Sequence, residues 1–279
     1  MTYKLIDLFA GAGGLTTGFH LAGWESLCAI DIDKKALATY KLNYPNTKVV
    51  NQDICKVNPS ELRLCLSLKR EELTALIGGP PCQGFSRNIP AVARSLNDPR
   101  NLLYKTFLEF VQEFRPLYAV MENVSEILKA YDGVVQNEIT EQLESFGYKV
   151  ASASLNAAHY GVPQTRTRAF FIASLDKLPY FPRPTHCGDT RSDYISAKSC
   201  NKQMDLFEPS ISSFVTVRDA IGDLPPLDAG QEYADEVLCR PVISAKYSWD
   251  QPFSVRRRCI SSPNIWSSLL GCINKKLKL

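Results

Sequence analysis

The residues with the clearest chemical potential surround Cys82, within the segment Ile77-Gly78-Gly79-Pro80-Pro81-Cys82-Gln83-Gly84-Phe85-Ser86. The two prolines each hold φ near about −65° and donate no backbone hydrogen bond, and the flanking glycines allow close backbone approach. An apolar run over residues 73–77 predicts a short buried strand that leads into this turn. A cysteine on a stiff loop at a strand end suits nucleophilic attack, because open α/β sheets bind ligands at that edge.

A glycine cluster near the N-terminus has features of a nucleotide-binding loop. Gly11 and Gly13 follow the first predicted strand and precede a helix, whose free N–H groups can hold a ligand. Asp31 lies 18 residues beyond Gly13, at the next strand end, where an acid can hold a ribose. Asp53 ends the third strand and is placed to reach an adenine amino group. The glycine spacing does not fit GxGxxG, which disfavours NAD.

Two further polar groups lie beside predicted strands. Glu122 ends an apolar strand, where its carboxyl can bind or protonate a ring nitrogen; the alternative is a cap on the following helix. Gln164, Arg166 and Arg168 alternate at the start of a strand over residues 169–173, so their side chains should face one side. Paired guanidinium groups suit a phosphate or a carbonyl oxygen, and a solvated strand start is the alternative.

The elements that must position these residues alternate along the first part of the chain. Strands are predicted at 4–9, 26–30, 48–50, 73–77, 117–121, 148–155 and 169–173, and helices at 15–22, 34–43, 102–114 and 134–146. This alternation predicts an α/β fold, a doubly wound and mostly parallel sheet with helices on both faces. Prolines punctuate the chain after Leu175, so we expect one domain over 1–175 and the beginning of a smaller, irregular second domain over 176–279.

Composition excludes several protein classes. The 279 residues are 45% hydrophobic and 22% charged, which is typical of globular domains. No run approaches the roughly 18–20 apolar residues that span a bilayer, and the N-terminus lacks the phases of a secretory signal, so we expect a cytoplasmic protein without membrane contact. The nine cysteines form no Cys/His cluster with zinc-ligand spacing, so no metal site is expected.

The net charge of +3 is unevenly distributed. From Arg240 onward eight basic residues accompany one acid, Asp250, which gives +7 in the last forty residues and −4 in the rest. A basic end suits a polyanion such as nucleic acid, with Arg256, Arg257 and Arg258 as candidate contacts. A solvated basic tail explains the same composition.

Together these blocks resemble the DNA (cytosine-5) methyltransferase family in sequence, order and spacing. The matching segments are Asp7-Leu8-Phe9-Ala10-Gly11-Ala12-Gly13-Gly14, Gly79-Pro80-Pro81-Cys82-Gln83-Gly84-Phe85-Ser86, Glu122-Asn123-Val124 and Gln164-Thr165-Arg166-Thr167-Arg168. A later segment, Thr216-Val217-Arg218-Asp219-Ala220-Ile221-Gly222-Asp223-Leu224-Pro225, is similar to one common in bacterial members. The resemblance covers residues 3 to 227 and implies a Rossmann-like methyltransferase fold, double-stranded DNA as substrate, and often a restriction-modification system.

The resemblance also implies a mechanism and the residues that perform it. The family transfers a methyl group from S-adenosyl-L-methionine to carbon 5 of a flipped-out cytosine through a covalent cysteine adduct. Cys82 would be the nucleophile, Glu122 would hold the base, and Arg166 and Arg168 would contact its carbonyl or a phosphate. Gln83 and Ser86 would flank the gap in the DNA. The residues implied to line the cofactor pocket are Phe9, Ala10, Gly11, Gly13, Asp31, Ile32, Asp53, Ile54, Pro80 and Leu103.

The chain also departs from the family pattern. Single-chain members continue with a target-recognition domain and two closing blocks, neither of which we find in this sequence. Residues 176–279 are therefore expected to hold a linker and a partial target-recognition region. Four alternatives stay open: a catalytic subunit that needs a second polypeptide, an inactive truncated fragment, a very reduced recognition region, and a tRNA cytosine-5 methyltransferase. An NAD-dependent oxidoreductase would leave the Pro-Pro-Cys segment unexplained.

Overall fold

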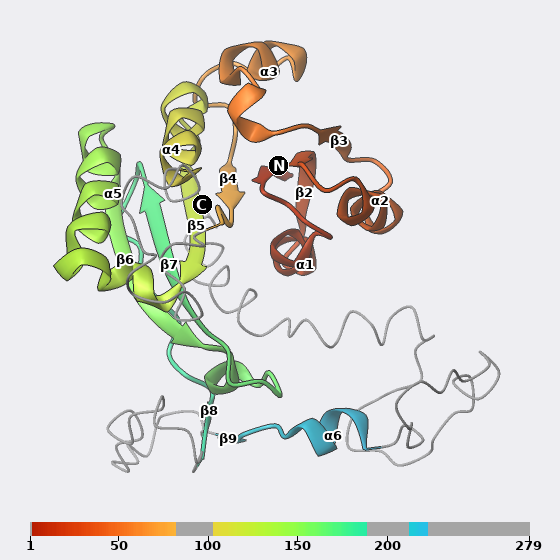
Figure 1. The fold of residues 1–279 in the computed structure, drawn as a ribbon, viewed down its shortest axis with the longest axis vertical. Helices are drawn as coiled ribbons and strands as arrows, with labels where there is room; N and C mark the ends of the chain where they lie inside the picture. The colour runs from red at the N-terminus through yellow and green to blue at the C-terminus, as the bar shows by residue number, and fades with distance from the viewer. Residues whose placement is uncertain (1, 82–102, 189–211, 223–279) are drawn as a thin grey trace.

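The centre of the molecule is a seven-stranded sheet with the order β3-β2-β1-β4-β5-β7-β6 (Figure 1). The computed structural model describes residues 2–81, 103–188 and 212–222. Strands β1 to β5 pair in parallel, whereas β7 is antiparallel to both of its neighbours. The strands of the sheet are β1 Tyr3–Leu8, β2 Trp24–Asp31, β3 Lys48–Asn51, β4 Ala75–Gly78, β5 Tyr118–Val124, β6 Lys149–Asn156 and β7 Thr167–Ser174.

Helices cover both faces of this sheet, as alternate residues of β1 show. Ile6 and Leu8 pack in the core beneath α3, α4 and α5, whereas Leu5 packs on the other face with Phe19 of α1. The α-helices of the sheet region are α1 Gly14–Leu21, α2 Lys34–Asn43, α3 Pro59–Cys65, α4 Leu103–Phe114 and α5 Val134–Ser145. The 3-10 helices are η1 Ile54–Lys56, η5 Ser125–Leu128, η6 Ala130–Gly133 and η7 Ala157–Tyr160. The predicted doubly wound α/β fold is thus confirmed.

Local sequence signals account for several element boundaries. All four residues of β4 are buried, as expected for a central parallel strand covered on both faces. The Asp33 side chain accepts hydrogen bonds from two backbone amides at the start of α2, the helix predicted at the same residues. Helix α3, which was not predicted, has Asn58 as its N-cap and Pro59 in its first turn.

Beyond the sheet the structure describes only short elements. Strand β8, His186–Cys187, pairs in parallel with β9, Ser212–Ser213, and α6, Val217–Ile221, begins with a capping box between Thr216 and Asp219. Most of the second predicted domain, 176–279, falls on residues outside the described ranges, so that boundary stays a prediction.

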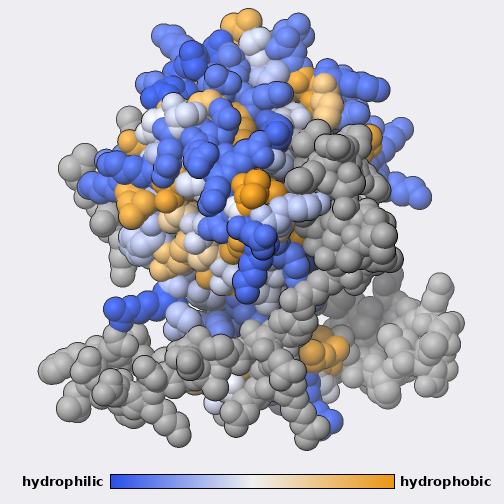
Figure 2. Space-filling model, turned by 60° about the vertical axis from the view of Figure 1, so that its left-hand side comes forward, coloured by the Kyte–Doolittle hydropathy of each residue, from blue (hydrophilic) through white to orange (hydrophobic). Residues whose placement is uncertain are grey.

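The described surface is mostly hydrophilic on the face drawn in Figure 2, where apolar residues form small separate patches. Among the helices that the structure describes, we find none with the length and apolar character needed to cross a membrane.

Candidate active site

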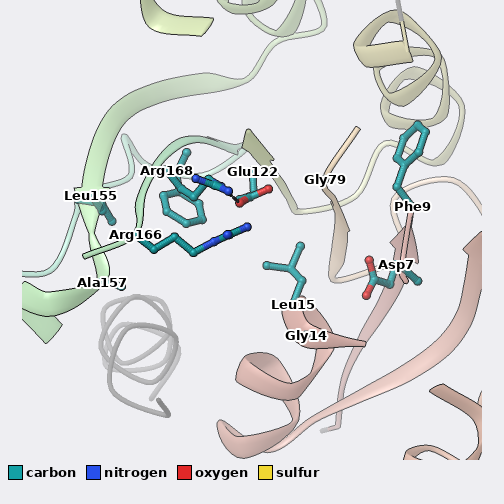
Figure 3. Close-up of a pocket in the computed structure, with 12 residues that line it drawn as sticks. Asp7, Phe9, Gly14, Leu15, Gly79, Glu122, Leu155, Ala157, Arg166 and Arg168 are labelled. Carbon is teal, nitrogen blue, oxygen red and sulfur yellow. Dashed lines mark ion pairs between the residues drawn. The ribbon is translucent and has the colours of Figure 1, made fainter. Parts of the chain in front are cut away.

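A cavity of about 350 Å³ opens at the carboxyl ends of β1, β4 and β5, where several of the predicted site residues converge. One wall comes from β1 and the start of α1, and the other from β5, β6 and β7 (Figure 3). The residues that line it are Asp7, Phe9, Ala10, Gly14, Leu15, Gly79, Glu122, Leu155, Ala157, Arg166, Arg168 and Phe170.

The glycine loop between β1 and α1 turns sharply at three positions. Phe9 has φ of 60°, Gly11 has φ of 54° and Gly13 has φ of 92°, all in the left-handed region. A Cβ atom at Gly13 would lie 2.9 Å from ring atoms of both Tyr40 and Tyr44, so a side chain would clash there. Asp31 Oδ2 accepts a hydrogen bond of 2.7 Å from the Gly11 amide, which ties the loop to the end of β2. Asp31, the residue predicted to bind a ribose, therefore also fixes the shape of the loop.

Asp7 is a site residue that the sequence analysis did not select. It is only 1% exposed, and its Oδ2 accepts a 2.6 Å hydrogen bond from the Thr16 hydroxyl on α1. The Thr16 hydroxyl lies 2.9 Å from the Tyr40 hydroxyl, which in turn lies 2.8 Å from the Ser26 hydroxyl. Burial raises the pKa of Asp7 to about 7, with a smaller contribution from the Asp31 charge and an opposing one from Thr16. The feature of the sequence that could have identified Asp7 as a site residue is its position at a strand end, like that of Asp31.

The opposite wall carries charge. Arg168 Nε lies 3.0 Å from Glu122 Oε1, and these side chains are 25% and 26% exposed. Burial raises the pKa of Glu122, although Arg168 and Arg166 oppose the shift. Figure 3 shows the Arg166 and Arg168 side chains both extending toward Glu122. Gln164, expected to point with them, precedes β7 and is not among the lining residues.

The end of β4 is fitted closely to β5. A Cβ atom at Gly79 would lie 3.2 Å from Glu122 Oε2, and one at Gly78 would lie 2.7 Å from the Leu8 carbonyl oxygen. The buried Asn123 side chain donates a 3.0 Å hydrogen bond from Nδ2 to the Pro80 carbonyl oxygen. The strand and the first proline of the Pro-Pro-Cys segment are therefore held in place immediately before Cys82.

The structure brings only part of the predicted site together. Phe9, Ala10, Glu122, Arg166 and Arg168 line the cavity, and Gly11, Gly13 and Asp31 shape the loop beside it. The other predicted residues lie elsewhere or beyond the described ranges, as the following positions show.

Five predicted cofactor-binding residues lie outside both the lining of this cavity and the loop beside it. Ile32 is 71% exposed just after β2, whereas Ile54 is part of the hydrophobic core and Leu103, the first residue of α4, packs against that core. Asp53 Oδ1 accepts a 3.1 Å hydrogen bond from the Cys55 amide and so caps η1. Pro80 is buried. Six predicted residues fall outside the described ranges: Cys82, Gln83, Ser86, Arg256, Arg257 and Arg258.

Within the described residues, no group of three or more His, Cys, Asp or Glu side chains is arranged to hold a metal ion. The acids of the cavity instead face arginines or hydrogen-bond donors, as described above.

Comparison with known families decides the identity of this fold. The model of the C-5 cytosine-specific DNA methylase family matches residues 3–235. The chain belongs to this family. The resemblance drawn from the sequence motifs is therefore confirmed, and the matched range includes both walls of the cavity.

Individual relatives agree with the family match. The type II methyltransferase M.AgeI of Thalassovita gelatinovora is 41% identical over 225 residues, which is 80% of this chain and 51% of M.AgeI. M.AquIA of a Picosynechococcus strain is 36% identical over 235 residues, 81% of this chain and 90% of M.AquIA. A solved E. coli prophage-encoded protein described as a DNA modification methyltransferase has 30% identity and a TM-score of 0.60, covering 81% of this chain and 56% of that one.

The chain spans about half the length of several curated relatives that it matches, with 51%, 55% and 50% of M.AgeI, M1.HphI and M.DdeI covered. M.AquIA differs from these relatives because nearly its whole length is matched.

Proposed function

We propose that this chain carries the catalytic machinery of a DNA (cytosine-5) methyltransferase of the restriction-modification type. The reaction would transfer a methyl group from S-adenosyl-L-methionine to carbon 5 of cytosine in double-stranded DNA. The observation that carries this proposal is the Glu122–Arg168 pair, which faces the glycine loop across one cavity at the strand end that leads to Cys82.

The glycine loop fits an adenosyl cofactor. At Gly11 and Gly14 an added Cβ would have no atom within 4 Å, so the backbone leaves open space that a ligand can occupy. Gly13 is the N-cap of α1 and has no side chain, so the cap residue itself gives the amides of the first turn no side-chain partner. Asp31, at the end of β2, is the candidate partner of a ribose hydroxyl. When bound, the cofactor would supply an electrophilic methyl group.

The catalytic roles follow from the chemistry of cytosine, whose carbon 5 is a poor nucleophile. Addition of the Cys82 thiolate at carbon 6 would make carbon 5 electron-rich, and this carbon would then take the methyl group. Loss of the carbon-5 proton as the carbon–sulfur bond breaks would restore the aromatic ring. The target carbon is inaccessible in a stacked duplex, so the base must leave the helix.

Glu122 and the arginines would hold the extruded base during these steps. Because burial raises the Glu122 pKa, its protonated form is more accessible than in an exposed glutamate, and it can donate a hydrogen bond to the ring nitrogen N3. That bond would draw electrons from the ring and favour attack at carbon 6. The guanidinium groups of Arg166 and Arg168 would contact the base carbonyl or a nearby phosphate.

The test is a methyl-transfer assay with labelled cofactor, using duplex DNA and tRNA as separate substrates. The Cys82→Ser variant should lose transfer to DNA while binding the cofactor with nearly unchanged affinity. DNA with 5-fluorocytosine should trap a covalent adduct with the unaltered protein, because fluorine cannot leave as the proton does. Transfer to tRNA alone would favour the tRNA enzyme, and full activity of Cys82→Ser would refute the covalent mechanism.

Activity of this chain is proposed to need the recognition and closing parts found in longer family members, supplied by a second polypeptide. The matched region covers about half of M.AgeI but 90% of M.AquIA, so relatives of about this size exist. The assay should therefore be run on the purified chain alone and with neighbouring gene products. Activity of the chain alone would contradict the need for a partner, and inactivity in every combination would favour a truncated fragment.

A further inference from the structure

Asp7 faces the cavity as a buried acid for which the described residues provide no cation. Glu122, the other acid of the lining, is paired with Arg168, whereas the hydrogen bonds of Asp7 come from Thr16. Figure 3 shows the Asp7 carboxyl on the β1 wall, with the two arginine side chains on the opposite wall. An ionised carboxylate in this position would have no compensating positive charge from the described part of the chain, and a ligand could provide one.

We propose that the Asp7 carboxylate discriminates the positively charged methyl donor from its neutral demethylated product. This inference rests on the proposed function, because it assigns a ligand to the same cavity. S-adenosylmethionine carries a sulfonium charge that S-adenosylhomocysteine lacks, while the rest of the two molecules is nearly identical. A carboxylate in a poorly solvated site attracts that charge and so changes the ratio of the two affinities. Release of the spent cofactor would be favoured as a consequence.

The proposed role of Asp7 can be detected by the number of protons released when each compound binds. Because burial raises the Asp7 pKa to about 7, the carboxyl of the free protein is only partly ionised near neutral pH. Among the described residues, the charged and titratable groups around it are Asp31 at the end of β2, Tyr40 on α2, and Glu122, Arg166 and Arg168 across the cavity. A cation that binds beside Asp7 favours the ionised form, so its binding should release protons, whereas the neutral product should release fewer.

A purely structural role for Asp7 makes a different prediction. The carboxyl receives hydrogen bonds from the hydroxyl and backbone amide of Thr16, in the first turn of α1, and thus acts as a cap from another element. Thr16→Val removes the hydroxyl donor and keeps the carboxyl. Asp7→Asn keeps the shape and removes the charge. If Asp7 only stabilises the helix, each variant should weaken the binding of the methyl donor and of the product by the same factor.

The experiment is calorimetric titration of the full chain with each compound, at about pH 6 and about pH 8, on either side of the Asp7 pKa of about 7. At the higher pH, Asp7→Asn should lower the ratio of the affinity for S-adenosylmethionine to the affinity for S-adenosylhomocysteine about tenfold. This is the size expected for loss of one partly screened charge interaction. Thr16→Val should preserve the ratio. An unchanged ratio in Asp7→Asn would overturn the inference.

If the Asp7→Asn variant does not fold, the unaltered protein can still be used to test the inference. Titrations in buffers of different ionisation enthalpy count the protons released on binding. Greater release with the methyl donor than with the product, retained in Glu122→Gln, supports Asp7 as the source, and equal release contradicts it. Failure to bind either compound would overturn the proposed function as well, whereas binding of both without discrimination would overturn only this inference.

Discussion

The two walls of the cavity are stabilised in different ways. On the β1 side, Asp7, Thr16, Tyr40 and Ser26 form a chain of hydrogen bonds, and each of these residues is less than 9% exposed. On the β5–β7 side, Glu122 and Arg168 form an ion pair in which about a quarter of each side chain remains exposed. One wall therefore depends on buried hydrogen bonds between elements, and the other on charges that water can reach.

This difference separates two tasks. Buried hydrogen bonds in a region of low dielectric fix the relative positions of β1, α1 and α2, so the loop between them is formed before a ligand arrives. A partly exposed ion pair contributes little to the free energy of unfolding. Its two side chains can therefore separate and bind a substrate instead at a small cost in free energy. We therefore expect changes on the β1 wall to alter stability and cofactor affinity, and changes on the β5–β7 wall to alter reaction rate.

Among changes to the two walls, the largest effect is expected from Glu122→Gln. Loss of a positioned acid should lower the methyl-transfer rate by about 10³-fold, within the usual range for general acid–base groups. Cofactor affinity and unfolding free energy should change little, because the pair with Arg168 is partly exposed. Single-turnover kinetics and calorimetry of the variant measure these quantities separately.

Glu138→Gln is the matched control for that substitution. Glu138 pairs with Lys105 at 2.7 Å, and both side chains are more than 40% exposed, away from the residues that line the cavity. Its transfer rate should equal that of the unaltered protein. A large loss of cofactor binding in Glu122→Gln would contradict the proposed division between the walls.

Next in size is the pH dependence of stability that Asp7 should impose. Its pKa rises from 3.8 to about 7 on folding, so the folded state holds the proton more tightly than the unfolded state. The stabilising contribution is complete below about pH 4 and lost as pH rises to about 7, a total of about 4 kcal/mol. Denaturant unfolding across this range should show that loss in the unaltered protein relative to Asp7→Asn. If the unfolding free energies of the two proteins changed with pH in parallel, the raised pKa of Asp7 would be refuted.

The sequence was sufficient to predict the alternation of strands and helices, and hence the sheet edge where Asp31 and Glu122 lie. It did not predict that β7 runs antiparallel between β5 and β6. The apolar run of this strand indicates burial but is the same in either direction. Gln164 was expected to point with Arg166 and Arg168, but β7 begins only at Thr167. Arg166, one residue before β7, still lines the cavity with Arg168, so the expected alternation ends before it reaches Gln164.

The role of Asp7 could not be predicted because it depends on contacts between elements. A strand-end acid has the same local pattern whether it faces solvent, as at Asp33, or is enclosed, as at Asp7. Its burial results from the packing of α1 and α2, which bring Thr16 and Tyr40 beside β1. The N-cap of α3 was different, since Asn58 followed by Pro59 is a local helix-start signal visible in the sequence.

The smallest expected effect tests how rigid the β1 wall is. In Gly13→Ala the new Cβ would lie 2.9 Å from the rings of Tyr40 and Tyr44, at a φ of 92° that alanine rarely adopts. The cost should be about 2 kcal/mol of unfolding free energy, from overpacking and backbone strain together. Gly14→Ala is the matched control, because nothing lies within 4 Å of its Cβ and alanine favours the helix by up to about 1 kcal/mol. Equal stability of the two variants would mean that the tyrosines can move aside, and that the glycine loop is formed by its ligand rather than before it.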